Sequence, residues 1–275
     1  LQKEGMKHFI RKQGENLTEG QVALKAGTFL TPSRIGLCAT MGHKSISVVK
    51  RLRVAIISTG DELKQPGDKL ERGEIYESNS FGLAGLVKWL GHYPVRMHCV
   101  GDTLESLRES LNTAAEDCDL ILTSGGVSMG EWDLVRRIME DEGDVHFWRV
   151  KLRPGSPPLF GLWKSTPIFG LPGNPVSSHV VFRTLVGPWI RNATSATGPT
   201  EVRAFAKLAT AVKPTKDSLT LRRVTIETTE EGLVAHQKIH QGSGNLASIA
   251  YSEGMVVLQP ERDYSIGDMV EVMIL

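Results

Sequence analysis

A glycine-rich segment in the middle of the chain has the composition of a phosphate-binding loop. It reads Thr123-Ser124-Gly125-Gly126-Val127-Ser128-Met129-Gly130 and directly follows an apolar run. Glycines allow backbone N–H groups to approach an anion closely, and the N-terminus of a following helix favours negative charge. We therefore predict a phosphate site here. The structural alternative is a tight strand-to-helix turn in which the glycines serve only backbone geometry and packing.

Acidic side chains follow other apolar runs and could hold a divalent cation. The segment Ser58-Thr59-Gly60-Asp61-Glu62-Leu63 ends one run, Asp102 follows the next, and Asp133 falls in the first turn of a predicted helix. Hard cations prefer carboxylate oxygens and bridge phosphates, so a carboxylate cluster of Asp61, Glu62, Asp102 and Asp133 around the glycine segment predicts Mg²⁺. Helix capping and compensation of the helix dipole are the alternatives for the aspartates.

Two further segments could contact an anion. Arg149, Lys151 and Arg153 alternate before Pro154-Gly155, which would place all three cations on one face of a strand. That face could bind a phosphate or an oxyanion, or it could be a solvated basic face. Leu171-Pro172-Gly173-Asn174-Pro175 combines prolines of fixed φ with a glycine and a capping Asn, which gives either a preset ligand loop or a structural helix entry.

Composition and residue spacing exclude several other classes of protein. The 32 basic and 31 acidic residues nearly balance, so a global field for nucleic acid or an anionic membrane is absent. No apolar run approaches the roughly 20 residues of a membrane span. The three cysteines and eight histidines lack paired metal spacing, and no Gly-x-Ser-x-Gly segment occurs. An odd number of dispersed cysteines favours the reducing cytoplasm.

Alternating apolar runs and helical periods predict the sheet that would position these loops. Residues 54–58 form a run typical of a strand buried on both faces, and residues 79–90 show helical spacing before Gly91. Strands that alternate with helices predict right-handed βαβ units in a doubly wound sheet, which binds ligands beyond the carboxyl ends of its strands. The remaining predicted strands are 95–100, 119–123, 145–150 and 167–170, and the helices are 103–115, 131–139 and 176–189.

The chain divides into three predicted parts. Residues 1–51 contain turn signals between short apolar runs, which favours short strands in a small β-rich piece. Residues 52–200 form the α/β domain, with a mostly parallel sheet. Residues 201–275 consist of short alternating segments, which is typical of a small β-barrel.

Taken together, four ordered motifs resemble the MoeA family of molybdopterin molybdenumtransferases, which includes the gephyrin E domain. They are Ser58 to Leu63, Ser124 to Asp133, Arg153-Pro154-Gly155 and Leu171 to Pro175. The resemblance implies Mg²⁺-dependent insertion of molybdate into adenylylated molybdopterin, with release of AMP, in a molybdopterin-binding α/β domain. It assigns Glu62, Asp102 and Asp133 to Mg²⁺ and proton handling, and Arg149 and Arg153 to catalytic cations where the family commonly has lysine. The cofactor-binding positions that it implies are Thr59, Gly60, Asp61, Ser124, Gly125, Gly126, Val127, Ser128, Pro172, Gly173, Asn174 and Pro175.

The resemblance also carries expectations about partners and completeness. It implies a homodimer, a cytoplasmic location and molybdopterin adenylyltransferase as a partner. Asn16 stands where the family usually has Asp, and the family's upstream lobe is expected to be missing, which would put activity in doubt. One alternative is the related molybdopterin adenylyltransferase, against which the Leu171 to Pro175 loop and the barrel weigh. Another is a gephyrin-like scaffolding or peptide-binding module without turnover.

Overall fold

The computed structural model describes residues 11–127, 133–197 and 201–275. These residues fall in two compact units. The smaller unit is drawn from Leu1–Val49 and Arg191–Gly198, and the larger from Lys50–Ile190 and Pro199–Leu275. No helix within the described ranges is long and apolar enough to cross a membrane.

Within the described residues 11–51, the chain forms helix α1 (Pro32–Thr40) rather than the expected strands. Thr31 is its N-cap and accepts a hydrogen bond from the Arg34 N–H, while Pro32 stands at the first helical position. Both residues favour a helix start. The prediction of short strands in residues 1–51 is therefore wrong for the described residues 11–51, which include no strand.

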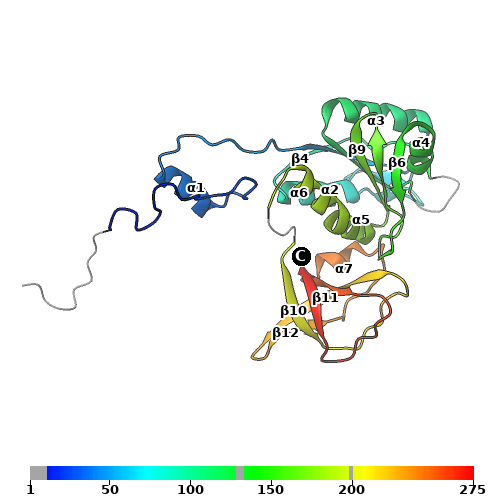
Figure 1. The fold of residues 1–275 in the computed structure, drawn as a ribbon. Helices are drawn as coiled ribbons and strands as arrows, with labels where there is room; N and C mark the ends of the chain where they lie inside the picture. Colours follow the sequence, from blue (N-terminus) through cyan, green and yellow to red (C-terminus); the bar gives the residue numbers. More distant parts are fainter. Residues whose placement is uncertain (1–10, 128–132, 198–200) are drawn as a thin grey trace, which may run out of the picture. The chain divides into compact units, whose positions relative to one another are not determined.

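The larger unit is built on a six-stranded sheet with the order β4-β1-β5-β9-β8-β6 (Figure 1). Neighbours from β4 to β9 run parallel, and β8 is antiparallel to both β9 and β6. A mostly parallel sheet is thus confirmed, although β8 was not predicted. The strands are β1 (Arg53–Ser58), β4 (Tyr93–Arg96), β5 (Leu120–Ser124), β6 (Asp144–Trp148), β8 (Leu159–Trp163) and β9 (Thr166–Leu171).

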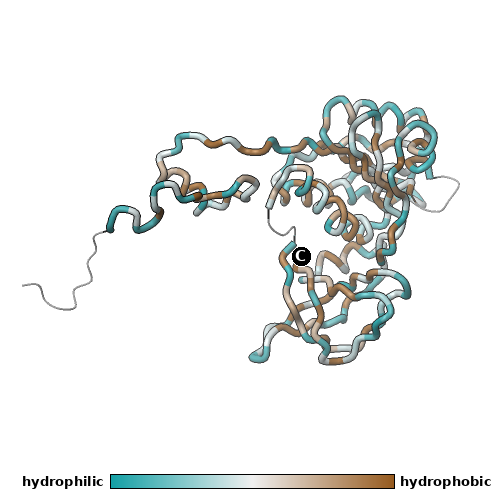
Figure 2. Tube along the Cα trace, viewed as in Figure 1, coloured by the Kyte–Doolittle hydropathy of each residue, from teal (hydrophilic) through white to brown (hydrophobic). Residues whose placement is uncertain are grey.

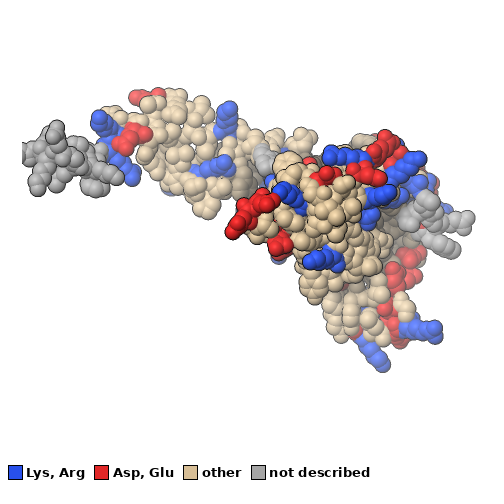
Figure 3. Space-filling view, turned by 90° about the horizontal axis from the view of Figure 1, so that it is seen from below, with Lys and Arg blue, Asp and Glu red and all other residues tan. Residues whose placement is uncertain are grey.

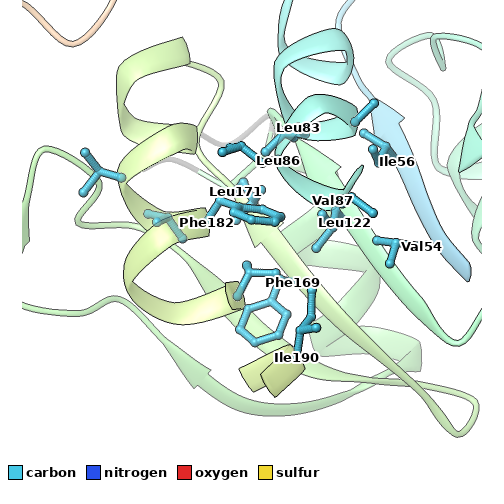
Figure 4. Close-up of a cluster of buried hydrophobic side chains, with 14 of the residues drawn as sticks. Val54, Ile56, Leu83, Leu86, Val87, Leu122, Phe169, Leu171, Phe182 and Ile190 are labelled. Carbon is cyan, nitrogen blue, oxygen red and sulfur yellow. The ribbon is translucent and has the colours of Figure 1, made fainter. Parts of the chain in front are cut away.

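Helices cover both faces of this sheet because its central strands are apolar on both sides. In β1, Val54 and Ile56 pack in one buried cluster, whereas Ala55 and Ile57 pack in another on the opposite face. Figure 4 shows the first cluster, and these strands are brown, the apolar colour, in Figure 2. The helical elements are α2 (Asn79–Trp89), α3 (Leu104–Asp117), α4 (Leu134–Glu142), α5 (Pro175–Val181), the π-helical segment Phe182–Val186 and α6 (Gly187–Ala193).

The C-terminal part closes into a five-stranded barrel, as predicted. Its order is β12-β10-β14-β13-β11, and β12 also pairs with β11, which completes the circle. The short strand β7 (Leu152–Arg153) adds to β11, so a piece of chain between β6 and β8 joins the barrel sheet. The other elements are β10 (Arg203–Leu208), β11 (Leu219–Thr229), β12 (Gly232–His236), α7 (Leu246–Ala250), β13 (Gly254–Leu258) and β14 (Met269–Ile274), besides the small pair β2 (Leu63–Lys64) and β3 (Ile75–Tyr76).

Candidate functional site

Three of the predicted loops begin at one edge of the sheet. Strands β1, β5 and β9 are neighbours, and Ser58 lies opposite Ser124, which in turn lies opposite Leu171. The Thr59 N–H donates to the Ser124 carbonyl at 3.1 Å, and the Gly125 N–H donates to the Leu171 carbonyl at 3.0 Å. The structure therefore brings together the residues that follow all three strands.

The glycines of the β5 loop have backbone shapes that only glycine tolerates well. Gly125 and Gly126 have φ values of 102° and 63°. A Cβ atom on Gly125 would lie 2.7 Å from the Thr59 carbonyl oxygen and 2.8 Å from its Oγ1. The Gly126 carbonyl accepts a hydrogen bond from the Arg136 N–H in α4. The loop is thus wedged between β1 and α4.

Val127 and Ser128 were also predicted to bind the cofactor from this loop. The Val127 side chain is 1% exposed and packs in the buried cluster of α3 and α4, so only its backbone could face a ligand. Ser128 lies outside the described residues.

Asn79, the first residue of α2, connects two of the loops. Its Nδ2 donates to Ser124 Oγ and to the Gly173 carbonyl, both at 2.7 Å. Sequence reasoning did not select Asn79. The available signal was the polar run Glu77-Ser78-Asn79-Ser80 at the start of a helix that faces the predicted ligand edge.

The buried carboxylate of Glu77 holds the end of β1 through a hydrogen bond with Ser58. Glu77 is 2% exposed, and it accepts hydrogen bonds from Ser58 Oγ at 3.0 Å and from the Ser80 N–H at 2.7 Å. Ser80 Oγ donates to Glu77 Oε2 and accepts from Arg96 Nε, while Arg96 also forms an ion pair with the carboxylate at 3.8 Å. The Glu77 carboxylate and the Ser58 and Ser80 hydroxyls all have hydrogen-bond partners in this network. The network therefore holds the start of the Thr59 loop in place. The sequence analysis missed this network too.

The predicted carboxylates are only partly brought together. Asp61 Oδ1 accepts a hydrogen bond from the Asp102 N–H at 3.0 Å, which places the loops after β1 and β4 in contact. Glu62 is exposed and curls back over Gly60, where a Cβ atom would lie 2.6 Å from its Oε2. No group of three His, Cys, Asp or Glu residues close enough to hold a metal ion occurs among the described residues. The expected four-carboxylate cluster is therefore not present in that part of the chain.

One acidic side chain nevertheless fits a cation. Asp133 is the N-cap residue of α4, yet its side chain makes no capping hydrogen bond. Its Oδ2 is buried and has no hydrogen-bond partner in the described structure. A buried carboxylate oxygen without a partner is costly, and a hard cation would satisfy it. Asp133 Oδ2 is therefore one candidate ligand for Mg²⁺. On the surface view of Figure 3 acidic and basic side chains are interspersed.

The three basic residues do not share one strand face, so that prediction is wrong. Strand β6 ends at Trp148, and Arg149 follows with a φ of 73°. The Arg149 N–H donates to the Pro158 carbonyl because the chain folds back on itself there. Arg153 lies in β7 and pairs with Thr220 of the barrel. This turn interrupts the alternation, so Arg149 lies in the loop after β6, whereas Arg153 lies in β7 of the barrel sheet.

Arg149 is held in place by an aromatic ring. Its guanidinium carbon lies 4.3 Å from the centre of the Trp148 ring, and that of Arg136 lies 3.7 Å from the same ring. Contacts of this kind attract a cation to the ring face. Trp148 thus contacts two guanidinium groups, and one of them belongs to Arg136 of α4, whose N–H donates to the Gly126 carbonyl.

The Pro172 to Pro175 loop meets a loop of the barrel. Asn174 was expected to cap α5, but its side chain makes no capping bond and Nδ2 instead donates to Ser243 Oγ at 3.1 Å. The Val176 N–H donates to the Ser243 carbonyl. Arg223 is fully buried and donates to the carbonyls of His240 and Gly242, which fixes the barrel loop. The site edge is therefore built from both sheets.

Comparison with known proteins gives consistent matches along the chain. Residues 55–192 match the family described as "Probable molybdopterin binding domain", and residues 206–275 match "MoeA C-terminal region (domain IV)". The chain is 33% identical over 266 residues to a molybdopterin molybdenumtransferase of Haemophilus influenzae, which covers 96% of this chain and 66% of that relative. It is 37% identical over 224 residues to molybdopterin molybdenumtransferase 2 of Mycobacterium tuberculosis, with 79% and 55% covered.

A solved structure agrees with these matches. The chain superposes on the molybdopterin biosynthesis moeA protein from Pyrococcus horikoshii with a TM-score of 0.82 at 29% identity, covering 95% of this chain and 64% of that chain. The chain thus spans less than two thirds of the length of each of these three relatives.

Proposed function

The chain belongs to the family described as "Probable molybdopterin binding domain" and carries a MoeA-type C-terminal region, and from this membership we propose that it is a molybdopterin molybdenumtransferase of molybdenum cofactor biosynthesis. The proposed substrates are molybdate and adenylylated molybdopterin. Molybdate enters the dithiolene of the pterin, and AMP is released.

The observation that supports this proposal is that the loops after three neighbouring strands, β1, β5 and β9, lie in contact at one edge of the sheet. The loops after β1, β5 and β9 are hydrogen-bonded to one another through Thr59, Gly125 and Asn79. Ligands of open α/β sheets bind at this edge. Backbone amides of a glycine loop bind phosphate oxygens. The Gly125 N–H already donates to the Leu171 carbonyl, so the Gly126 N–H and the Ser124 hydroxyl are proposed to hold the phosphate of the pterin.

The charged residues at this edge have separate proposed roles. Asp133, whose buried Oδ2 has no hydrogen-bond partner in the described structure, is proposed to contact Mg²⁺, which when bound would offset the negative charge of the phosphates. Glu62 and Asp102, which do not form a cluster with it among the described residues, are proposed to act from the neighbouring loops. Arg149 and Arg153 are proposed to attract the molybdate dianion, and an Arg can offer it two parallel donors. Glu62 is proposed to exchange a proton during the reaction, which its exposed carboxylate supports.

The remaining cofactor contacts are proposed for the loop Pro172 to Pro175 and for Asp61. Asp61 would act through its bond to the Asp102 N–H, which ties together two acidic loops. A homodimer, a cytoplasmic location and an encounter with molybdopterin adenylyltransferase complete the proposal. The barrel and the Pro172 to Pro175 loop favour the transferase over an adenylyltransferase.

Titration calorimetry with adenylylated molybdopterin, Mg²⁺ and molybdate tests the proposal, followed by assays of AMP release and of cofactor formation. The expected result is binding and AMP release that depend on molybdate and disappear when Mg²⁺ is chelated. Binding without release would indicate a scaffolding or peptide-binding role instead. Absence of binding would overturn the assignment of a pterin site to this chain.

A further inference from the structure

We propose that Asn79 is a positioning residue that clamps the glycine loop and the Pro172 to Pro175 loop at the distance the ligand requires. This inference rests on the proposed function, because it assigns a role within the same site. Asn79 lies outside the four motifs that carry the family resemblance.

The donor capacity of Asn79 is fully used by the two loops. An Asn amide nitrogen has two hydrogens. Both are directed at loop atoms, one at Ser124 Oγ and one at the Gly173 carbonyl, and both distances are 2.7 Å. The Gly173 carbonyl can only accept, so the amide nitrogen, and not the oxygen, must face it. The chemistry of the contact therefore fixes the orientation of the side chain.

The pairing of strands β5 and β9 ends at Ser124 and Leu171, so the two loops lie just beyond the ladder that holds the strands in register. They approach so closely that a Cβ atom on Gly173 would lie 3.6 Å from the Gly125 Cα. Glycines at the contact supply no side chain that could hold one loop against the other. One backbone bond, from the Gly125 N–H to the Leu171 carbonyl, lies beside the contact. Asn79 adds two directional bonds from a third element, helix α2.

The remaining polar atom of Asn79 also points to a role with a ligand. Asn79 Oδ1 is buried and has no hydrogen-bond partner in the described structure. A buried acceptor without a donor is unfavourable. Because the atom is buried in the ligand-free chain, a ligand N–H could pair with it only after the loops shift on binding, whereas a purely structural Asn would be expected to have its oxygen paired already.

The variant Asn79→Asp separates a clamp from simple packing. The carboxylate has nearly the same size as the amide, but it has no N–H to donate. Ser124 can turn its hydroxyl to donate to the new carboxylate. The Gly173 carbonyl cannot, so two acceptors would then face each other and the loop after β9 should be released. Asn79→Ala removes both bonds without adding charge.

Asn112→Asp provides a matched control. Asn112 lies in α3 and uses its oxygen, Oδ1, to accept from Trp163 Nε1. A carboxylate retains that acceptor, so the same chemical change should leave the contact intact.

Hydrogen–deuterium exchange of the ligand-free 275-residue chain tests the clamp directly. We expect amides in peptides covering 121–127 and 168–181 to exchange about tenfold faster in both Asn79 variants and at the wild-type rate in Asn112→Asp. The dissociation constant of adenylylated molybdopterin should rise about tenfold in the Asn79 variants. Urea unfolding establishes that each variant is folded.

The exchange rates test the clamp, and the dissociation constant tests its role towards the ligand. Unchanged exchange of both peptides in Asn79→Asp would overturn the clamp. Faster exchange with an unchanged dissociation constant would overturn a positioning role towards the ligand. A wild-type chain that binds no molybdopterin would overturn the proposed function, and the exchange rates would still decide whether Asn79 clamps the two loops.

Discussion

Gly125 lies against Thr59 so closely that a Cβ atom on the glycine would be 2.7 Å from the threonine carbonyl oxygen. Gly125→Ala is therefore expected to lower the free energy of unfolding by about 1–3 kcal/mol, because the alanine meets both an unfavourable φ and a backbone contact. Since the loop must move to make room, binding of molybdopterin should weaken too. Urea unfolding and titration calorimetry measure the two effects.

Gly67→Ala is the control for this variant. Gly67 has a φ of 103°, nearly that of Gly125, but a Cβ atom there would have no neighbour within 4 Å. Gly67→Ala should therefore lower the free energy of unfolding only by the cost of placing an alanine at this φ, with no added backbone contact. Equal losses of stability in the two variants would contradict a tight approach between Gly125 and Thr59.

Glu62→Ala is expected to abolish most turnover while preserving the fold. Glu62 is exposed, so its loss removes little buried contact. Loss of a carboxylate from proton handling or metal binding lowers the rate by at least about a hundredfold. Assays of AMP release and thermal unfolding measure both properties, with exposed Glu116→Ala in α3 as the control. Wild-type turnover in Glu62→Ala would remove Glu62 from the mechanism.

Trp148→Leu is expected to weaken molybdate binding through Arg149. The ring holds the guanidinium at 4.3 Å, and loss of a cation–π contact costs about 0.5–1 kcal/mol, which corresponds to roughly a two- to fivefold change in affinity. The KM for molybdate is the quantity to measure. Tyr93→Leu removes a similar stack on Arg51, at 5.5 Å, and should leave that KM unchanged. An unaltered KM in Trp148→Leu would show that the ring does not position Arg149.

The stability of the protein should fall on acidification through His179. Burial, and secondarily the charge of Arg183, lower the pKa of His179 from 6.5 to about 4. The folded-state pKa is below the unfolded value, so the unfolded state binds the proton more readily between these values. The stabilising contribution is therefore complete above pH 6.5 and is lost as the pH falls through about 4, to a total of at most about 3 kcal/mol.

His179→Gln tests the source of this pH dependence. The ring is closely packed, since a Cβ atom on Gly82 would lie 2.7 Å from His179 Nε2. The variant should lose overall stability, because the packed ring is removed. Its free energy of unfolding in urea should decline less steeply than that of the wild type between pH 7 and pH 4, because the lowered pKa of His179 no longer contributes. Exposed His98→Gln should retain the wild-type profile. A parallel decline in wild type and His179→Gln would assign the acid sensitivity to other groups.

The local pattern of the sequence determined the sheet and the loops at its edge. The apolar run at residues 54–58 became β1, and the helix before Gly91 became α2, because burial on two faces and helical periodicity are properties of adjacent residues. The same holds for the glycine loop and for the Pro172 to Pro175 loop, which follow β5 and β9. The family membership followed from the order of these motifs.

Tertiary structure decided which side chains meet across the site. Asn79 contacts Ser124 and Gly173 from 45 and 94 residues away, and Asn174 contacts Ser243 from 69 residues away. Arg149 and Arg153 were separated because the chain turns between them and enters a second sheet. Such contacts depend on how strands and loops pack in three dimensions, and neither residue type nor spacing along the chain specifies that packing.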